Sequence, residues 1–165
     1  MAGCAIAGAG PTAKTARAQA LEQPQGHVIL TIRGSITRTN AHGAARFDRA
    51  MLQAMPQTVV ETMTPWTDGI TRFKGPLARD VMSRVGATGR AVKATAINDY
   101  AVEIPLSDFE AYPVILATQM NGEVLRTRTK GPVWVIYPWS DHADLRTEVI
   151  YGRSIWQLKE MVVVE

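Results

Sequence analysis

The sequence predicts an α+β fold, a mixed, strongly twisted and barrel-like sheet with two main helices. Runs in which apolar and polar residues alternate, the pattern of half-buried strands, outnumber the helical patterns. Helices and strands also do not alternate regularly, which argues against a doubly wound parallel sheet. The chain of 165 residues is 46% hydrophobic and 20% charged, values typical of a globular domain with its own core.

Two helices and eight strands are expected along the chain. The helices span residues 44–55 and 76–85, and the second starts with Pro76 and stops at Gly86, residue types that suit those positions. A short helical turn capped by Ser107 is expected at 107–112. The expected strands cover residues 28–33, 58–64, 91–97, 100–104, 114–119, 133–137, 148–151 and 157–164. Residues 133–137 are apolar throughout, which is typical of a central strand.

Composition excludes several classes of function. The formal charge of +3 is spread along the chain, whereas nucleic-acid binders gather Lys and Arg on one face. Cys4 is the single cysteine, so a disulfide framework and a cysteine-based zinc site are excluded. The histidines, His27, His42 and His142, are too scattered for the spacing of a metal site.

Residues 1–20 are set apart from the expected domain, residues 21–165, by their content of small residues. Ala16-x-Ala18 and Ala18-x-Ala20 match the small-x-small pattern that precedes signal-peptide cleavage. A charged start and a long apolar stretch are missing. Two interpretations stay open, an export signal that lacks its beginning and a disordered leader, and the cleavage pattern favours the first.

Several segments in the second half of the chain resemble one known family. They are Ala96–Pro105, then the pair Val114–Ala117 and Asn121–Leu125 around an Asn-Gly turn, then Gly131–Pro138, and finally Ser154–Met161. Their order and spacing resemble the molybdopterin-binding domain of the sulfite oxidase superfamily, over about residues 28–164. The resemblance implies the sulfite-oxidase-type fold and a pocket for a pterin-like group.

One departure from that family bears on chemistry. The resemblance implies that, in its enzymes, a cysteine at the end of the second strand supplies a thiolate to molybdenum. The corresponding stretch here, Glu61–Trp66, contains no cysteine. A threonine hydroxyl is barely acidic and a thioether is neutral, so neither replaces the soft anionic ligand. We therefore expect no molybdenum and no oxidase chemistry.

The chain is most similar to metal-free relatives in that superfamily. These are exported proteins of the bacterial periplasm that bind a pterin and report it to a membrane partner controlling cyclic-di-GMP. The resemblance implies a non-catalytic, periplasmic sensor component for a neopterin- or dihydropterin-like ligand. Two alternatives remain, a molybdopterin-dependent oxidoreductase with oxygen or solvent ligands to the metal, and an adaptor domain whose pocket is vestigial.

Three loops at strand ends carry the groups that a pterin requires. A pterin ring stacks on aromatic faces, offers a donor edge to a carboxylate or amide, and offers a carbonyl to an arginine. The loops are Pro65–Asp68 with Arg72 close behind, Asn98–Tyr100 and Pro138–Asp141. The candidate ligand contacts are therefore Trp66, Asp68, Arg72, Asn98, Asp99, Tyr100 and Trp139.

Structural explanations compete with each of these assignments. Asp68 and Asp99 are residues that stabilise turns through their own backbone. Arg72 also fits an ordinary solvated charge, and Tyr100 a strand residue with its hydroxyl outward. Trp134 and Trp156 are expected in the core. The sequence shows no nucleophile–base pair and no carboxylate dyad, which favours binding over catalysis.

Overall fold

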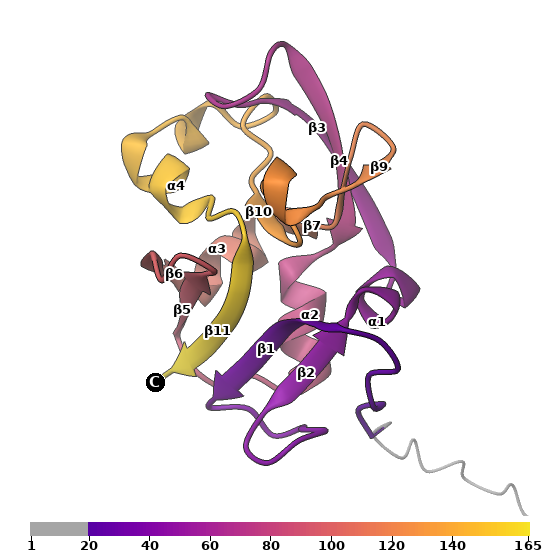
Figure 1. Ribbon diagram of the computed structural model, residues 1–165. Coiled ribbons are helices and arrows are strands. Elements are labelled where there is room, and N and C mark those ends of the chain that lie inside the picture. Colours follow the sequence, from indigo (N-terminus) through magenta and orange to yellow (C-terminus); the bar gives the residue numbers. More distant parts are fainter. Residues whose placement is uncertain (1–19) are drawn as a thin grey trace, which may run out of the picture.

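The computed structural model describes residues 20–165 (Figure 1). The expected leader, apart from Ala20, and Cys4 lie outside the described residues. Over the described part the fold is α+β, as predicted, with three sheets and four α-helices. None of these sheets closes into a barrel. No helix in this part of the chain is long and apolar enough to cross a membrane.

The largest sheet has five strands in the order β2-β1-β11-β5-β6. Their bounds are β1 Val28–Gly34, β2 Ala45–Asp48, β5 Ala91–Ala96, β6 Ala101–Pro105 and β11 Leu158–Val164. The last strand lies at the centre, parallel to β1 and antiparallel to β5. The first and the last strand of the described chain thus pair with each other in this sheet.

A second layer of strands lies beyond this sheet (Figure 1). One sheet has the order β3-β4-β8-β9, with β3 at Gln57–Met63, β4 at Ile70–Pro76, β8 at Gln119–Met120 and β9 at Glu123–Val124. The other is a pair of fully buried strands, β7 Ile115–Ala117 and β10 Trp134–Ile136. The prediction that residues 133–137 form a central strand is confirmed only in part. As a strand β10 pairs with β7 alone, but on its other side the Val135 N–H donates to the Ile155 carbonyl and the Val133 carbonyl accepts from the Leu158 N–H, both at 3.0 Å.

Four α-helices cover these sheets, α1 Arg49–Ala54, α2 Ala78–Val85, α3 Leu106–Ala111 and α4 Glu148–Arg153. Two short 3-10 helices, η1 and η2, span Thr127–Thr129 and Ala143–Leu145. Helix α2 confirms the predicted helix and its end, and Ala78, Val81, Met82 and Val85 are buried. Its predicted start at Pro76 is wrong, because Pro76 is the last residue of β4 and Leu77 is the N-cap. Gly86 ends the helix at a φ of 64°, where a residue without Cβ is least strained.

Three further predictions about helices and strands are wrong. The helix expected at 44–55 starts late, because residues 45–48 pair with β1 and Asp48 caps α1 by accepting from the Met51 N–H at 2.8 Å. Residues 148–151 form a helix, not a strand, since the Thr147 hydroxyl accepts from the Ile150 N–H and opens α4. Ser107 does not cap α3, whose N-cap is Pro105.

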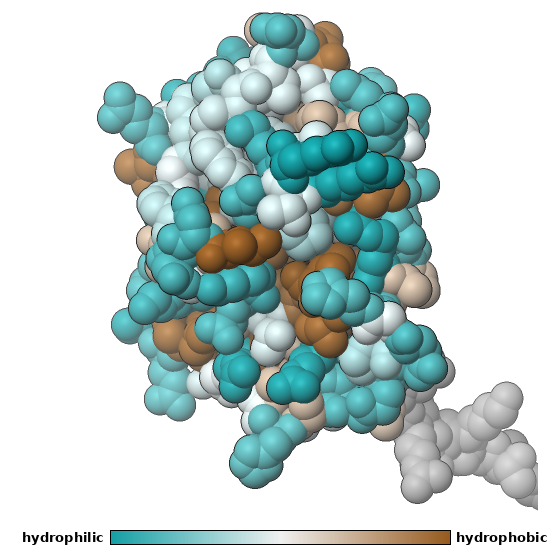
Figure 2. Space-filling model, viewed as in Figure 1, coloured by the Kyte–Doolittle hydropathy of each residue, from teal (hydrophilic) through white to brown (hydrophobic). Residues whose placement is uncertain are grey.

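The core runs through both layers and becomes aromatic at the end where β10 and α4 meet. Trp134, Tyr137 and Trp139 are almost completely buried there. Phe73 on β4 packs edge-on against Trp134, with ring centroids 5.2 Å apart. On the face seen in Figure 2, hydrophobic atoms reach the surface only in small patches among hydrophilic side chains. The aromatic end of the core borders the cavity described next.

Candidate functional site

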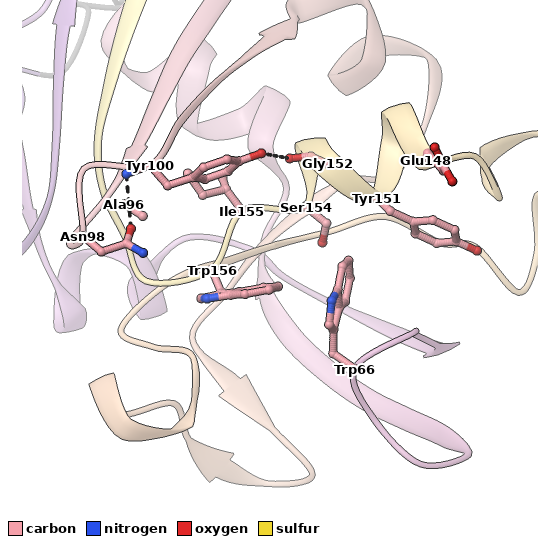
Figure 3. A pocket seen from close by; sticks show the side chains of 10 residues that line it. All are labelled: Trp66, Ala96, Asn98, Tyr100, Glu148, Tyr151, Gly152, Ser154, Ile155 and Trp156. Atoms are coloured by element: carbon pink, nitrogen blue, oxygen red, sulfur yellow. Dashed lines mark hydrogen bonds between the residues drawn. The ribbon is translucent and has the colours of Figure 1, made fainter.

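A cavity of about 490 Å³ opens between α4, the turn that joins β5 to β6, and the loop that joins β3 to β4 (Figure 3). Its lining residues are Trp66, Ala96, Asn98, Tyr100, Glu148, Tyr151, Gly152, Ser154, Ile155 and Trp156. Sites for small molecules have volumes of about 300–1,000 Å³. The cavity is thus large enough for a flat ring system of two fused rings.

Aromatic side chains form one side of this cavity. The rings of Trp66 and Trp156 have centroids 5.3 Å apart at an interplanar angle of 74°, so the two walls meet edge to face. Tyr151 stands at 88° to Trp66, with centroids 6.0 Å apart. In Figure 3 Trp66 stands between Trp156 on one side and Tyr151 on the other. Such an aromatic corner offers a stacking face to a planar ligand.

Trp66 is held by its own loop and by the core behind it. The Trp66 N–H donates to the Thr64 hydroxyl at 3.1 Å, and the hydroxyls of Thr64 and Thr67 lie 2.7 Å apart. Behind Trp66 lies Trp139, with ring centroids 6.1 Å apart. The hydrogen bonds of the loop and the packing of Trp139 therefore hold the Trp66 ring at the wall of the cavity.

Trp156 was expected in the core, but it is only partly buried and lines the cavity. The Lys130 ammonium lies 4.1 Å from the centroid of the Trp156 ring, a cation–π distance. The backbone fixes this pair, because the Gln157 N–H donates to the Lys130 carbonyl at 2.9 Å. Lys130 is not among the cavity-lining residues.

Polar groups stand at the edge of the cavity. The Asn98 side-chain oxygen accepts from the Tyr100 N–H at 3.2 Å, which leaves its amide nitrogen available to a ligand. The Tyr100 hydroxyl donates to the Gly152 carbonyl at 3.3 Å and ties the turn to α4. Glu148 contributes a carboxylate from the first turn of α4. Asn98 and Glu148 lie at opposite ends of the lining side chains in Figure 3, so they suit different edges of a heterocycle.

Asp99 lies between two lining residues but does not line the cavity itself. It adopts a φ of 66°, and its carboxylate accepts from the Lys159 ammonium at 2.7 Å. This hydrogen bond and the Lys159 charge hold the pKa of the Asp99 carboxyl below its usual value. The observed role is a surface ion pair at a turn. The turn bond that was weighed for Asp99 is made by its neighbour Asn98, whose side-chain oxygen accepts from the Tyr100 N–H.

The other predicted residues are also placed outside the lining. Asp68 is exposed at the tip of the β3–β4 loop, and Arg72 is exposed on β4. Trp139 is 1% exposed and packs behind Trp66. Of the seven candidates, the structure therefore brings Trp66, Asn98 and Tyr100 to one cavity.

The sequence reasoning missed the contribution of α4, which supplies Glu148, Tyr151 and Gly152. The apolar pair Val149-Ile150 before Tyr151 suggested a strand. Thr147 is nevertheless a residue type that is favoured at the N-cap of a helix, and this signal could have identified α4. An ion pair anchors the far end of the helix, since Arg153 donates to Asp108 at 2.9 Å.

Asp108 joins this anchor to the buried core. The Tyr137 hydroxyl donates to the Asp108 carboxylate at 2.8 Å. Burial, with the Asp108 charge, raises the pKa of Tyr137 well above its usual value, so the hydroxyl remains a donor. The network connects α3, the end of β10 and α4, and it fixes the helical wall of the cavity.

The stretch Glu61–Trp66, where the family resemblance places a cysteine, is hydrogen-bonded to Ser140. The Ser140 N–H donates to the Thr62 hydroxyl at 3.0 Å, and the Met63 N–H donates to the Ser140 hydroxyl at 2.9 Å. Thr62 is fully buried, whereas the Met63 side chain is 60% exposed. Among residues 20–165, no group of three or more His, Cys, Asp and Glu side chains is arranged to hold a metal ion.

The fold of this chain is similar to that of a protein of known structure. A structure of the sulfane dehydrogenase SoxCD from Paracoccus pantotrophus is similar, with a TM-score of 0.61 and 16% sequence identity. The match covers 82% of this chain and 37% of the SoxCD chain, so this chain spans little more than a third of that protein's length. No curated protein sequence matches.

The sequence also matches a protein-family model. The model described as "Oxidoreductase molybdopterin binding domain" matches residues 29–142, which is more than half of the chain. These residues include β2 to β10, all of β1 except Val28, and all three loops that carry the predicted ligand contacts. The chain belongs to the oxidoreductase molybdopterin-binding domain family.

Proposed function

We propose that this chain binds a pterin without catalysing a reaction, and that it serves as the sensor component of a periplasmic signalling system. The observation that carries the proposal is the composition of the cavity, aromatic walls with one carboxylate and one amide at the edge. A pterin has a flat face for Trp66 and Trp156. Its amino group and ring N–H are donors that suit the Glu148 carboxylate.

The alternative is a molybdopterin-dependent oxidoreductase with a non-cysteine metal ligand, and the family membership speaks for it. The residues present fit it poorly. Molybdopterin carries a phosphate, for which proteins use cationic side chains or helix N-termini, and no Lys or Arg lines the cavity. The hydroxyls of Thr62 and Ser140 are engaged with each other and with Met63. No thiolate ligand is offered by residues 20–165.

The reporting step remains part of the proposal. The expected export signal supports the proposed periplasmic location, and the resemblance to metal-free relatives supports the proposed membrane partner. Neither depends on the cavity, so ligand binding and signalling are tested separately.

The first experiment measures the melting temperature of the purified chain with neopterin and with 7,8-dihydroneopterin. A ligand at 100 times its Kd stabilises the native state by about 2.7 kcal/mol, which raises Tm by about 5–10 °C for a domain of this size. No rise with any pterin would overturn the proposal. Stoichiometric molybdenum, measured by elemental analysis of protein from its native host, would favour the oxidoreductase.

A matched pair of variants tests the edge contact. Glu148→Gln keeps the shape but removes the charge, and we expect about tenfold weaker neopterin binding, because charge-assisted hydrogen bonds are roughly twice as strong as neutral ones. Glu123→Gln, on exposed β9, removes an equal charge away from the cavity and should leave the affinity unchanged. Calorimetric titration distinguishes the two. Equal affinities for both variants would remove Glu148 from the site.

A further inference from the structure

Strand β3 is an edge strand, since the sheet order places it beside β4 alone. On β4, the Arg72 N–H donates to the Asn121 side chain at 3.0 Å, and the Arg72 carbonyl accepts from the Asn121 N–H at 2.7 Å. The hydrogen-bonding groups of Arg72 thus face β8. The backbone N–H and C=O groups of successive residues in a strand point to opposite sides, so the N–H and C=O of Phe73 face β3.

The same alternation fixes the free edge of β3. Val60 is paired with Phe73 and faces β4, so its neighbours Val59 and Glu61 point their N–H and C=O groups away from the sheet. The next outward position agrees, because the Met63 N–H donates to the Ser140 hydroxyl and not to β4. Within residues 20–165, no hydrogen bond engages the outward groups of Val59 and Glu61.

A groove of about 480 Å³ runs along this edge. Residues 58–61 form one wall, and Pro113, Pro138 and Asp141 form the other. Two of these three opposing residues are prolines, which carry no N–H. Four unpaired backbone groups therefore face a space in which another extended chain can lie.

The two edges of the five-stranded sheet are better protected than β3. Strand β2 has four residues, and its pairing with β1 is interrupted by a register shift. Strand β6 is flanked by α4. Strand β3 has seven residues and pairs with β4 without a shift. Long, regular edges of this kind are the ones that accept added strands.

The charge of the groove indicates what kind of strand it accepts. Glu61 and Asp141 line it, no Lys or Arg does, and neither carboxylate has an ion-pair partner within 4.0 Å in residues 20–165. The cross-strand neighbour of Glu61 is Arg72, which is exposed. Antiparallel pairing of two copies about this position would place Glu61 against Glu61, and like charges directly opposite are destabilising.

We propose that the edge of β3 binds an extended, basic segment of a partner protein by strand addition. The outward groups of Val59 and Glu61 form the main-chain ladder, and a Lys or Arg of the segment lies against Glu61 and Asp141. The wall at 138–141 includes Trp139, whose ring packs on Trp66 of the cavity. The peptide groove and the cavity therefore share one structural element, but the proposal does not depend on which ligand the cavity takes.

The probe is a capped peptide of seven residues, the length of β3, in which Lys and Val alternate. It is titrated into the ¹⁵N-labelled full chain and followed by amide chemical shifts and hydrogen exchange. We expect shifts centred on residues 58–61, and new protection of the Val59 and Glu61 amides. The same peptide with Glu in place of Lys, or with N-methylated amides, should bind at least about tenfold more weakly.

Two variants at one position separate main-chain from side-chain binding. Val59→Pro removes only an N–H that the ladder with β4 does not use, and edge strands tolerate proline. It should weaken peptide binding about tenfold, whereas Val59→Ala, which keeps the N–H, should change it little. If Val59→Pro does not fold, the N-methylated peptide provides the equivalent comparison.

Three results would overturn the proposal. One is a set of shifts that lies away from β3, and another is undiminished binding of the N-methylated peptide. The third is a concentration-dependent dimer in sedimentation that Val59→Pro abolishes, because a second copy would then be the occupant of the edge.

Discussion

The pattern Pro-Trp-x-Asp occurs twice in this chain and produces two different structures. In the first loop, Pro65–Asp68, Trp66 is partly buried and lines the cavity. In the second, Pro138–Asp141, Trp139 is 1% exposed and supports Trp66 from behind. Both aspartates are exposed. The same four-residue pattern thus gives a wall of the cavity in one place and the core beneath it in the other.

The difference lies in what fastens each loop to the rest of the chain. The first loop is held mainly by local bonds of the Thr64 hydroxyl. The second is fixed from two sides, since Arg146 donates to the Trp139 carbonyl at 2.8 Å and Ser140 bonds to residues of β3. The loop at 138–141, which is hydrogen-bonded to β3 and to Arg146, holds its tryptophan in the core. The loop at 65–68, which has mainly local hydrogen bonds, leaves its tryptophan partly exposed.

The largest effect that we expect comes from the buried tryptophan. Trp139→Ala removes a fully buried ring and should lower the free energy of unfolding by about 3–5 kcal/mol, measured by urea denaturation. Trp66→Ala removes a partly exposed ring and should cost clearly less. Equal losses for the two variants would contradict the distinction between core and cavity wall.

The next effect tests how the second loop is fixed to β3. Thr62→Val removes the acceptor for the Ser140 N–H while keeping the volume, and should cost about 1–3 kcal/mol because Thr62 is fully buried. Ser140→Ala removes the acceptor for the Met63 N–H. In a double-mutant cycle the two changes should be non-additive. Additive losses would show that the two hydroxyls act independently.

Much of the fold could be predicted because its signals are local. The apolar face of helix α2 with Gly86 at its end, and the alternation of β1, β3, β5 and β6, are each visible within one short segment. The Asn121–Gly122 turn between β8 and β9 belongs to the same class, with both residues at positive φ. Such features depend on backbone preferences that neighbouring residues set.

The rest depends on contacts between distant segments. Residues 45–48 carry a helical pattern, yet they extend because β1 offers them a partner. Trp156 alternates with Leu158 in the way of a core residue, but the cavity beside α4 leaves one side of it open. Glu148 gave no signal at all, since its place in the cavity lining arises only when α4 packs near the turn at Asn98. Tertiary packing decided each of these positions.

A smaller effect concerns the exposed tryptophan as a ligand contact. Trp66→Leu keeps an apolar side chain but removes the aromatic face, which is worth about 0.5–1.5 kcal/mol beyond burial. We expect neopterin to bind about two- to tenfold more weakly, measured by calorimetric titration. Trp139→Phe keeps a ring behind Trp66 and should change the affinity less. The reverse order would place the ligand against the second loop.

The smallest effect is expected at the two aspartates that end the motif. Asp68→Asn and Asp141→Asn alter exposed carboxylates, so each should change the free energy of unfolding by no more than about 0.5 kcal/mol. Neither residue lines the cavity, and neopterin affinity should therefore stay the same in both variants. Only Asp141→Asn should weaken the basic peptide, because Asp141 lines the groove along β3. If Asp68→Asn weakened neopterin instead, the first loop would close over the ligand and bring its carboxylate to the ring, as the sequence alone suggested.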